Sequence, residues 1–202
     1  MEQRIKQIFA ESIKVKQDTD LTAEIKAAVQ SIAQSLGNGG KLLVCGNGGS
    51  AEQAQHFVGE FVGKYKKNRA PMAALALASH TPFLTAWSND YEFHTAFARE
   101  LEAIGNPEDV LVAISTSGNS KNVLAAVSAA KKLGIKTIGF CGQGGALQDS
   151  VDLALRVASR DTARIQETHL TIIHIISELV EDLAHPDHDY GDKNLEYNKR
   201  VS

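Results

Sequence analysis

The sequence predicts an α/β domain in which a doubly wound, mainly parallel sheet is flanked by helices. Short apolar runs of strand length alternate along the chain with helix-like patterns of apolar residues. These apolar runs are continuous, as in parallel strands that are covered on both faces. The length of 202 residues fits one domain, and the alternating order implies right-handed crossovers. We expect one domain over 1–202: a helical pair (1–38), an α/β core (39–184) and a polar tail (185–202).

Two amphipathic helices are predicted to open the chain, because apolar residues recur at helical spacing over 2–17 and again over 22–36. The glycine-rich stretch 37–40 ends the second helix. Strands are then predicted at 41–45, 73–78, 109–114, 136–141 and 153–157, with helical patterns between most of them. Cys45 and Cys141 end two of these strands and are interpreted as buried, reduced thiols.

The last predicted helix, 163–183, is apolar over much of its circumference. A helix on the surface shows one apolar stripe, so this helix is expected to be covered on several sides. The two opening helices also carry more apolar surface than one sheet can cover. We therefore expect a homo-oligomer with the N-terminal helices in its interface.

The charge balance gives no general attraction to nucleic acids or anionic membranes, because 21 lysines and arginines stand against 24 aspartates and glutamates. No apolar run approaches the roughly 18 residues of a spanning helix, and the charged N-terminal segment is unlike a signal peptide. We expect a cytoplasmic protein with no nucleic-acid or membrane partner. The most basic stretch, 64–69, is interpreted as a solvated helix end, with Arg69 as an alternative anion contact.

A glycine-rich loop, Gly46-Asn-Gly-Gly-Ser-Ala51, follows the first strand, at the edge of a parallel sheet where ligands bind. Its glycines allow close approach to the backbone, and Ser50 is predicted to cap the following helix. The loop matches neither Gly-x-Gly-x-x-Gly nor a Walker loop, which disfavours a nucleotide. It is either a polar cradle for a ligand or a turn that needs glycine only for its dihedral angles.

A second polar loop, Ser115-Thr-Ser-Gly-Asn-Ser120, places four hydroxyls directly before a predicted helix at 123–133. Free N–H groups and a partial positive charge at a helix N-terminus suit an anion. We predict that one phosphate monoester is held by Ser115, Thr116, Ser117 and Ser120. The alternative is that these hydroxyls only cap the helix.

A third polar stretch, Ser88-Asn-Asp90, follows a helical pattern that contains Trp87. Asparagine and aspartate offer the paired donors and acceptors that suit sugar hydroxyls. We predict a loop that contacts a polyol; an ordinary turn is the alternative.

Two predicted helices carry histidines and carboxylates at spacings that suit a common site. His56 and Glu60 lie four residues apart and share a helix face. Gln166 and His174 on the last helix are about 80 degrees apart around its axis and can face one cleft. Glu167 aligns with His174 even better and competes for an acid-base role. A lone histidine on an apolar helix is more often a core residue, but these donors would suit Zn²⁺.

Together these residues resemble the phosphoheptose isomerase family of sugar isomerase (SIS) domains, over nearly the whole chain. The resemblance rests on Cys-Gly-Asn-Gly-Gly-Ser-Ala at 45–51, Ala-Gln-His-Phe at 54–57 with Glu60, Ser-Asn-Asp at 88–90, Ile-Ser-Thr-Ser-Gly-Asn-Ser at 114–120, and Arg-Ile-Gln-Glu-Thr-His at 164–169 with His174. It implies a flavodoxin-like SIS fold and a homotetramer whose subunits share sites.

The resemblance also implies an activity. Members of this family convert D-sedoheptulose 7-phosphate to D-glycero-D-manno-heptose 7-phosphate through an enediol, in heptose and lipopolysaccharide core biosynthesis. It implies Glu60 as the base, His174 as its acid-base partner, and one Zn²⁺ per subunit on His56, Glu60, Gln166 and His174. Since metal binding lowers the basicity of a glutamate, a structural or regulatory zinc remains an alternative.

Substrate contacts are implied in the same way. They are Asn47, Gly48, Gly49, Ser50, Glu60, Asn89, Asp90 and Gln166, with the phosphate on Ser115, Thr116, Ser117 and Ser120. Ala163 departs from the family pattern, because some relatives carry aspartate there. The alternative function is a non-catalytic tetrameric SIS binding protein of the replication-initiator-associating (DiaA) type, or a regulator that only senses a sugar phosphate. Glu60 and His174 argue against both.

Overall fold

The structure is a computed structural model that describes residues 1–186. Most of the predicted polar tail, 187–202, lies outside the described residues. The strands are β1 (Leu42–Cys45), β2 (Ala74–Ala76), β3 (Val110–Ser115), β4 (Lys136–Cys141) and β5 (Leu153–Arg156). The helices are α1 (Glu2–Asp18), α2 (Thr22–Gly37), α3 (Gly49–Val62), α4 (Thr81–Asp90), α5 (Ala96–Ile104), α6 (Lys121–Lys132), α7 (Leu147–Ser150) and α8 (Thr162–Ala184), with a 3₁₀ turn at Phe93–Thr95. The predicted opening helices, strands and last helix are confirmed to within a few residues.

The five strands form one parallel sheet in the order β2-β1-β3-β4-β5. This is the doubly wound, flavodoxin-like order, and it confirms the predicted fold class. The order reverses between β1 and β3, which are paired directly, with Cys45 opposite Ala113. The loops that leave these two strands therefore emerge side by side, at the point where ligands bind in such sheets.

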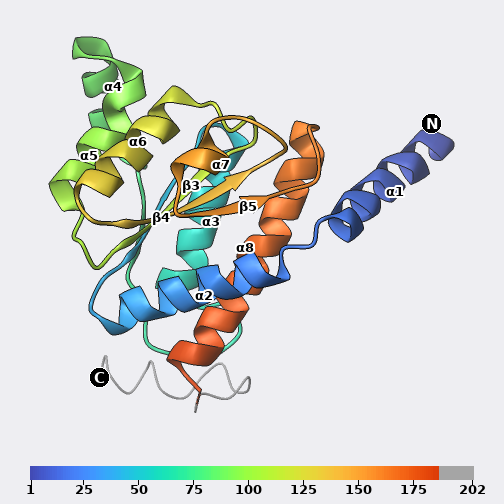
Figure 1. The fold of residues 1–202 in the computed structure, drawn as a ribbon, viewed down its shortest axis with the longest axis horizontal. Coiled ribbons are helices and arrows are strands. Elements are labelled where there is room, and N and C mark those ends of the chain that lie inside the picture. Colours follow the sequence, from blue (N-terminus) through green and yellow to red (C-terminus); the bar gives the residue numbers. More distant parts are fainter. Residues whose placement is uncertain (187–202) are drawn as a thin grey trace.

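Alternate residues of the central strands enter two apolar layers, one on each face of the sheet. On one face Val44 and Val112 pack against α2, α3 and α8; on the other Leu43 and Leu111 pack against α5 and α6. Figure 1 shows these two groups of helices on opposite sides of the sheet. Both faces are covered, which explains why the strands read as continuous apolar runs.

Helix α1 stands apart from this arrangement. It extends away from the body of the molecule (Figure 1), contacts α8, and has no buried residue of its own. Among the described residues, no helix is both long enough and apolar enough to cross a membrane.

The stretch Ser88-Asn-Asp90, which was expected to form a loop, is instead the last turn of α4. Pro82 lies in the first turn, where its fixed φ favours helix initiation. Trp87 is four residues from both Phe83 and Tyr91 and packs against both rings. These contacts extend the helix to Asp90 and explain why the loop prediction was wrong.

The basic stretch 64–69 was expected to be a solvated helix end, and for Arg69 this is wrong. The stretch wraps around the carboxylate of Glu181 on α8, which accepts hydrogen bonds from the backbone N–H groups of Tyr65, Lys66 and Lys67 at 3.1, 2.7 and 2.8 Å. Arg69 Nε pairs with the same carboxylate at 2.8 Å, and both side chains are almost fully buried. Arg69 is therefore an internal partner of a glutamate and not a site for an external anion.

Arg69 also closes the end of α3. Its guanidinium donates to the carbonyl oxygens of Glu60 at 2.7 Å and Phe61 at 3.0 Å, which lie in the last turn of that helix. A cation at a helix C-terminus is favourable because the exposed carbonyls carry partial negative charge. The Arg69–Glu181 pair thus holds the end of α3 against α8.

The pKa of Glu181 reflects this environment. Burial alone would raise the pKa, but hydrogen bonds from Lys67, Lys66 and Tyr65, together with the charge of Arg69, outweigh burial and hold it below its usual value. Because the native state favours the ionised form, the resulting stabilisation is present above the ordinary glutamate pKa of about 4.3. It is lost as the pH falls through the lower folded-state pKa.

We predict that Glu181→Gln lowers the free energy of unfolding by about 3 kcal/mol at neutral pH, because it leaves Arg69 buried without its counter-charge. The measurement is urea unfolding at fixed protein concentration. The matched control is Glu178→Gln, which breaks the more exposed pair with Lys66 and should cost less than about 1 kcal/mol. The difference in the free energy of unfolding between wild type and Glu181→Gln should become smaller in acid. A difference that stays constant would contradict the role of the ionised Glu181 carboxylate.

Candidate active site

The loops after β1 and β3 are joined by a reciprocal pair of amides. Asn47 Nδ2 donates to Asn122 Oδ1 at 2.8 Å, and Asn122 Nδ2 donates to Asn47 Oδ1 at 2.7 Å. Asn122 lies in the first turn of α6 and is buried. The two loops are therefore tied together, and both the nitrogen and the oxygen of the Asn47 side-chain amide are hydrogen-bonded.

The glycine loop brings α3 against α8. Gly48, with φ of +54°, is the N-cap of α3, a conformation that glycine adopts without strain. A Cβ on Gly49 would lie only 2.6 Å from Nε2 of Gln166, so the end of the Gln166 side chain occupies the space beside this glycine. Ser50 does not cap the helix: it is buried in the first turn, and its N–H donates to the Asn47 carbonyl. The capping prediction is wrong because the helix begins one residue before Ser50.

The serine loop turns from β3 into α6. Ser115 ends β3, and its hydroxyl lies 3.0 Å from that of Ser120. Thr116 is half-buried and Ser117 is exposed in the turn. Ser120 is the N-cap of α6, yet its side chain makes no capping hydrogen bond, so the hydroxyl is not committed to the helix. The four hydroxyls share one turn at the end of a helix, as predicted, and its first N–H groups lie beside them.

A neighbouring loop supports the serine loop from behind. The N–H of Gly142 donates to Thr116 O at 3.1 Å, that of Leu147 to Gly118 O at 2.9 Å, and that of Ala146 to Asn119 Oδ1 at 3.0 Å. These bonds tie the serine loop to the 142–147 segment, so contacts within the protein hold the turn in place.

Three polar side chains from α3 and α8 converge. His56 Nε2 lies 2.9 Å from His174 Nε2 and 3.2 Å from Glu60 Oε1, and all three ligand atoms lie within 4.8 Å of one another. His56 is exposed and the other two are half-buried, so the group is open to solvent. The structure thus brings together three of the four predicted metal ligands.

The donor set suits zinc. Two imidazole nitrogens and one carboxylate oxygen are typical ligands of Zn²⁺ at sites that keep a position open for water or substrate. Donor atoms on one tetrahedral zinc stand about 3.3 Å apart, given bonds of about 2.0–2.1 Å. The spacings of 2.9 and 3.2 Å around His56 are close to this value. The two facing nitrogens can form a hydrogen bond with each other when one carries a proton and the other does not.

Gln166, the fourth predicted ligand, lies at the loop end of α8. Its side chain contacts Gly49, and its backbone carbonyl accepts a hydrogen bond from Gln53 Nε2 at 2.7 Å. Gln166 precedes His174 by eight positions, so their backbones are about 12 Å apart along the helix axis. The structure therefore places Gln166 beside the glycine loop.

Glu167, the competitor for the acid-base role, points elsewhere. Its Oε1 pairs with Arg164 Nη2 at 2.6 Å, and it lines an apolar groove formed by α1. It is not a member of the group formed by His56, Glu60 and His174.

His169 is a core residue, in line with the more common role of a histidine on an apolar helix. It is fully buried, its ring packs edge-on against Phe140, and Nε2 lies 3.5 Å from the Cys141 carbonyl. Burial lowers its pKa to about 4, which keeps the ring neutral at physiological pH. Cys45 and Cys141 are free and buried, as predicted, and burial raises the pKa of the Cys45 thiol to about 12.

Asn89 and Asp90 are exposed at the end of α4 and are hydrogen-bonded to each other at 2.9 Å. Within residues 1–186, no hydrogen bond connects them to the glycine loop, the serine loop or the histidine group. Their contact with a substrate stays a prediction.

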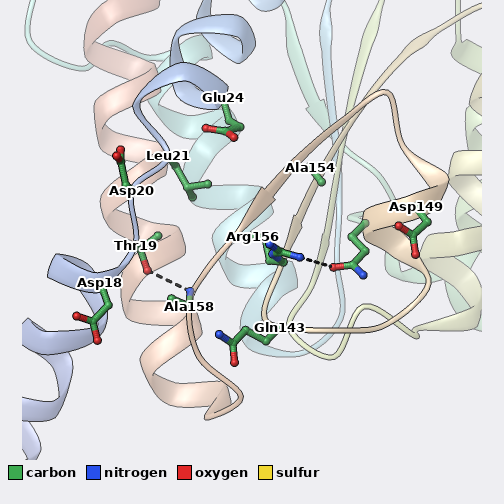
Figure 2. Close-up of a pocket in the computed structure, with 11 residues that line it drawn as sticks. Asp18, Thr19, Asp20, Leu21, Glu24, Gln143, Asp149, Ala154, Arg156 and Ala158 are labelled. Atoms are coloured by element: carbon green, nitrogen blue, oxygen red, sulfur yellow. Dashed lines mark hydrogen bonds between the residues drawn. The ribbon is translucent and has the colours of Figure 1, made fainter.

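A hollow of about 400 Å³ lies between the α1–α2 connection, β5 and the 143–149 segment (Figure 2). Asp18, Asp20, Glu24 and Asp149 contribute four carboxylates to its lining, against a single guanidinium from Arg156. Such a lining repels a phosphate dianion. The serine loop is thus the better place for a phosphate.

Four of the residues that organise the site were missed at the sequence level: Gln53, Tyr65, Asn122 and Glu181. Gln53 and Asn122 each sit in the first turn or two of a helix after a polar loop, which is a usable signal. Tyr65 and Glu181 lie in segments that look like a basic run and an apolar helix, and their partners are more than 100 residues away.

Comparison with known proteins identifies the class. The family pattern described as "SIS domain" matches residues 9–142, so the chain is a SIS-domain protein. A phosphoheptose isomerase of Campylobacter concisus (strain 13826) is 50% identical over 164 residues, which cover 81% of this chain and 87% of that protein.

Solved structures agree. Phosphoheptose isomerase GmhA from Neisseria gonorrhoeae is 41% identical, with a TM-score of 0.85 over 90% of this chain and 98% of that chain. A phosphoheptose isomerase from Francisella tularensis is 39% identical, with a TM-score of 0.86 over 89% and 97% of the two chains. The chain belongs to the phosphoheptose isomerase family.

Proposed function

We propose that the protein is an aldose-ketose isomerase that converts D-sedoheptulose 7-phosphate to D-glycero-D-manno-heptose 7-phosphate, in heptose and lipopolysaccharide core biosynthesis. The observation that carries the proposal is the convergence of His56, Glu60 and His174 on two helices that also meet at the glycine loop. Names of relatives at 50% identity support the same reaction.

The isomerisation moves one proton from C1 of the ketose to C2 and exchanges protons on the two oxygens. In the proposed mechanism the Glu60 carboxylate takes the proton from C1 and returns it to C2 of the enediol. His174 gives a proton to the oxygen on C2 and accepts one from the oxygen on C1. The two side chains share the His56 ring as a neighbour, so both can act on adjacent carbons of one substrate.

Zn²⁺ held by His56, Glu60 and His174, with Gln166 as a proposed fourth ligand, would polarise a sugar oxygen and organise the site. Glu60 cannot be fully coordinated and a strong base at the same time. A structural zinc is therefore a second form of the proposal, and metal removal distinguishes the two.

The phosphate is proposed to bind at Ser115, Thr116, Ser117 and Ser120. Support comes from the Ser120 hydroxyl, which makes no capping hydrogen bond to α6, and from the hydrogen bonds that join the turn to the 142–147 segment. The sugar chain would then run past Asn47, Gly48, Gly49 and Ser50 towards Glu60 and Gln166, with Asn89 and Asp90 as further contacts.

We also propose a cytoplasmic homotetramer. Helix α1 exposes Ile5, Phe9 and Ile13, with 67% of the Phe9 surface open to solvent, and forms an apolar groove with α8 of about 540 Å³. Exposed apolar faces of this kind are typical of subunit interfaces. The family resemblance favours a second subunit of the same protein as the partner that covers this groove.

The first test is conversion of D-sedoheptulose 7-phosphate by the purified protein, followed by NMR after chelation and after restoration of Zn²⁺. We expect turnover that follows zinc, and we expect Glu60→Gln to lower kcat by about 10²–10⁴-fold. Glu52→Gln, exposed on the same helix, is the control.

Other outcomes would change the proposal. Full activity in Glu60→Gln would move the base to Glu167 or elsewhere, and turnover indifferent to zinc would make the metal structural. Absence of turnover in either state, with the assembly intact, would favour the non-catalytic binding protein.

We predict that the double change Ser117→Ala with Ser120→Ala raises KM by about 10²-fold with kcat changed only a few-fold, because hydrogen bonds to a charged phosphate are lost. Steady-state kinetics measure both constants, with Ser31→Ala on α2 as the control. An unchanged KM would rule out the serine loop as the phosphate cradle.

Wild-type protein is expected to sediment at four times the 21.7 kDa subunit mass. Phe9→Asp should shift it to smaller species, because a charge would then have to be buried in the interface. Gln7→Asp, on the same helix, is the control. A Phe9→Asp protein that remains tetrameric would show that α1 lies outside the interface.

A further inference from the structure

The imidazole of His174 is in contact with two other rings. The Tyr65 ring stacks on it, with centroids 5.6 Å apart and planes inclined by 23°. The His56 ring meets it at a steeper angle, with centroids 5.1 Å apart and planes inclined by 61°. Tyr65 takes no part in the proposed chemistry, so its placement against a proposed acid-base group calls for an explanation.

The backbone of Tyr65 is fixed to the helix that carries His174. Its N–H is the first of the three that converge on the Glu181 carboxylate, at 3.1 Å. Glu181 follows His174 by seven residues, which is about two turns of α8. Tyr65 and His174 are therefore both fixed relative to α8. Movement of the 64–69 stretch relative to this helix would break buried hydrogen bonds.

A second link holds the same stretch. Lys66 Nζ lies 5.5 Å from the centroid of the Tyr65 ring and forms an ion pair with Glu178 of α8 at 2.7 Å. An ammonium at this distance attracts the electron-rich face of an aromatic ring. Glu178 lies four residues after His174. This link therefore also holds the tyrosine ring close to the turn of α8 that follows the histidine.

We propose that Tyr65 is a positioning residue that sets the plane of the His174 imidazole. The inference rests on the proposed function, in which His174 serves as a zinc ligand or as the acid-base group; both roles depend on the orientation of its ring. The terminal torsion of a histidine is broad, so the ring needs a packed neighbour to define its plane. Ligands and proton donors must be held within about 10–20° of the productive geometry, and a stacked ring supplies that restraint.

The test compares Tyr65→Leu, which removes the ring, with Tyr65→Phe, which keeps it. The readouts are the zinc dissociation constant, from competition with a chromophoric chelator, and kcat and KM for D-sedoheptulose 7-phosphate. We expect Tyr65→Leu to weaken zinc binding about tenfold and to lower kcat about tenfold, with KM within about twofold. Tyr65→Phe should keep all three constants within about twofold.

His174→Gln is measured in parallel to distinguish a failure of the Tyr65 inference from a failure of the proposed function. If it loses zinc and turnover while Tyr65→Leu keeps both, the stacking inference is wrong and the proposed function stands. Equal damage in Tyr65→Phe and Tyr65→Leu would also overturn it, because the hydroxyl and not the ring would be responsible. If His174→Gln keeps zinc and turnover, the role of His174 is wrong and the inference fails with it.

Thermal unfolding checks that each variant is folded. Should Tyr65→Leu fail to fold, Tyr65→Met replaces it with a flexible side chain that still fills the space, and the same outcomes apply.

Discussion

The buried carboxylate of Glu181 binds together two parts of the chain that are more than 110 residues apart. Three backbone N–H groups and the Arg69 guanidinium all point to it, and Arg69 in turn holds the last carbonyls of α3. A charge in this position is tolerable only because its partners are complete. The spacing between α3 and α8, and with it the spacing of the histidines, depends on this one carboxylate.

At the other end of the same two helices, α3 and α8 are held together by close packing and a hydrogen bond and not by an ion pair. Gly49 admits the Gln166 side chain, and Gln53 holds the Gln166 carbonyl. The pair of helices is therefore fixed at both ends, with His56, Glu60 and His174 between them. The parallel sheet adds the serine loop, because its strand order puts the loops after β1 and β3 next to each other.

Local patterns in the sequence were sufficient to predict the strands, the opening helices and the serine turn, because buried parallel strands and amphipathic helices leave short-range signals. Spacing also placed His56 and Glu60 on one face, and the family resemblance joined them to His174. Ser50 and the 88–90 stretch were misassigned because both lie at helix ends, where a shift of one or two residues decides between loop and helix. Arg69 and Tyr65 acquire their roles from Glu181, and nothing near them in the sequence indicates that partner.

The distance along the chain between α3 and α8 has a consequence for biosynthesis. His56 and His174 are 118 residues apart, and the Tyr65–Glu181 bond spans 116. Translation delivers the sheet first, and the last helix leaves the ribosome only when nearly the whole polypeptide has been made. Until then the first histidine and its glutamate have no third donor beside them. A nascent or truncated chain that lacks α8 is thus unable to assemble the group of His56, Glu60 and His174, so this group is completed only late in the synthesis of each subunit.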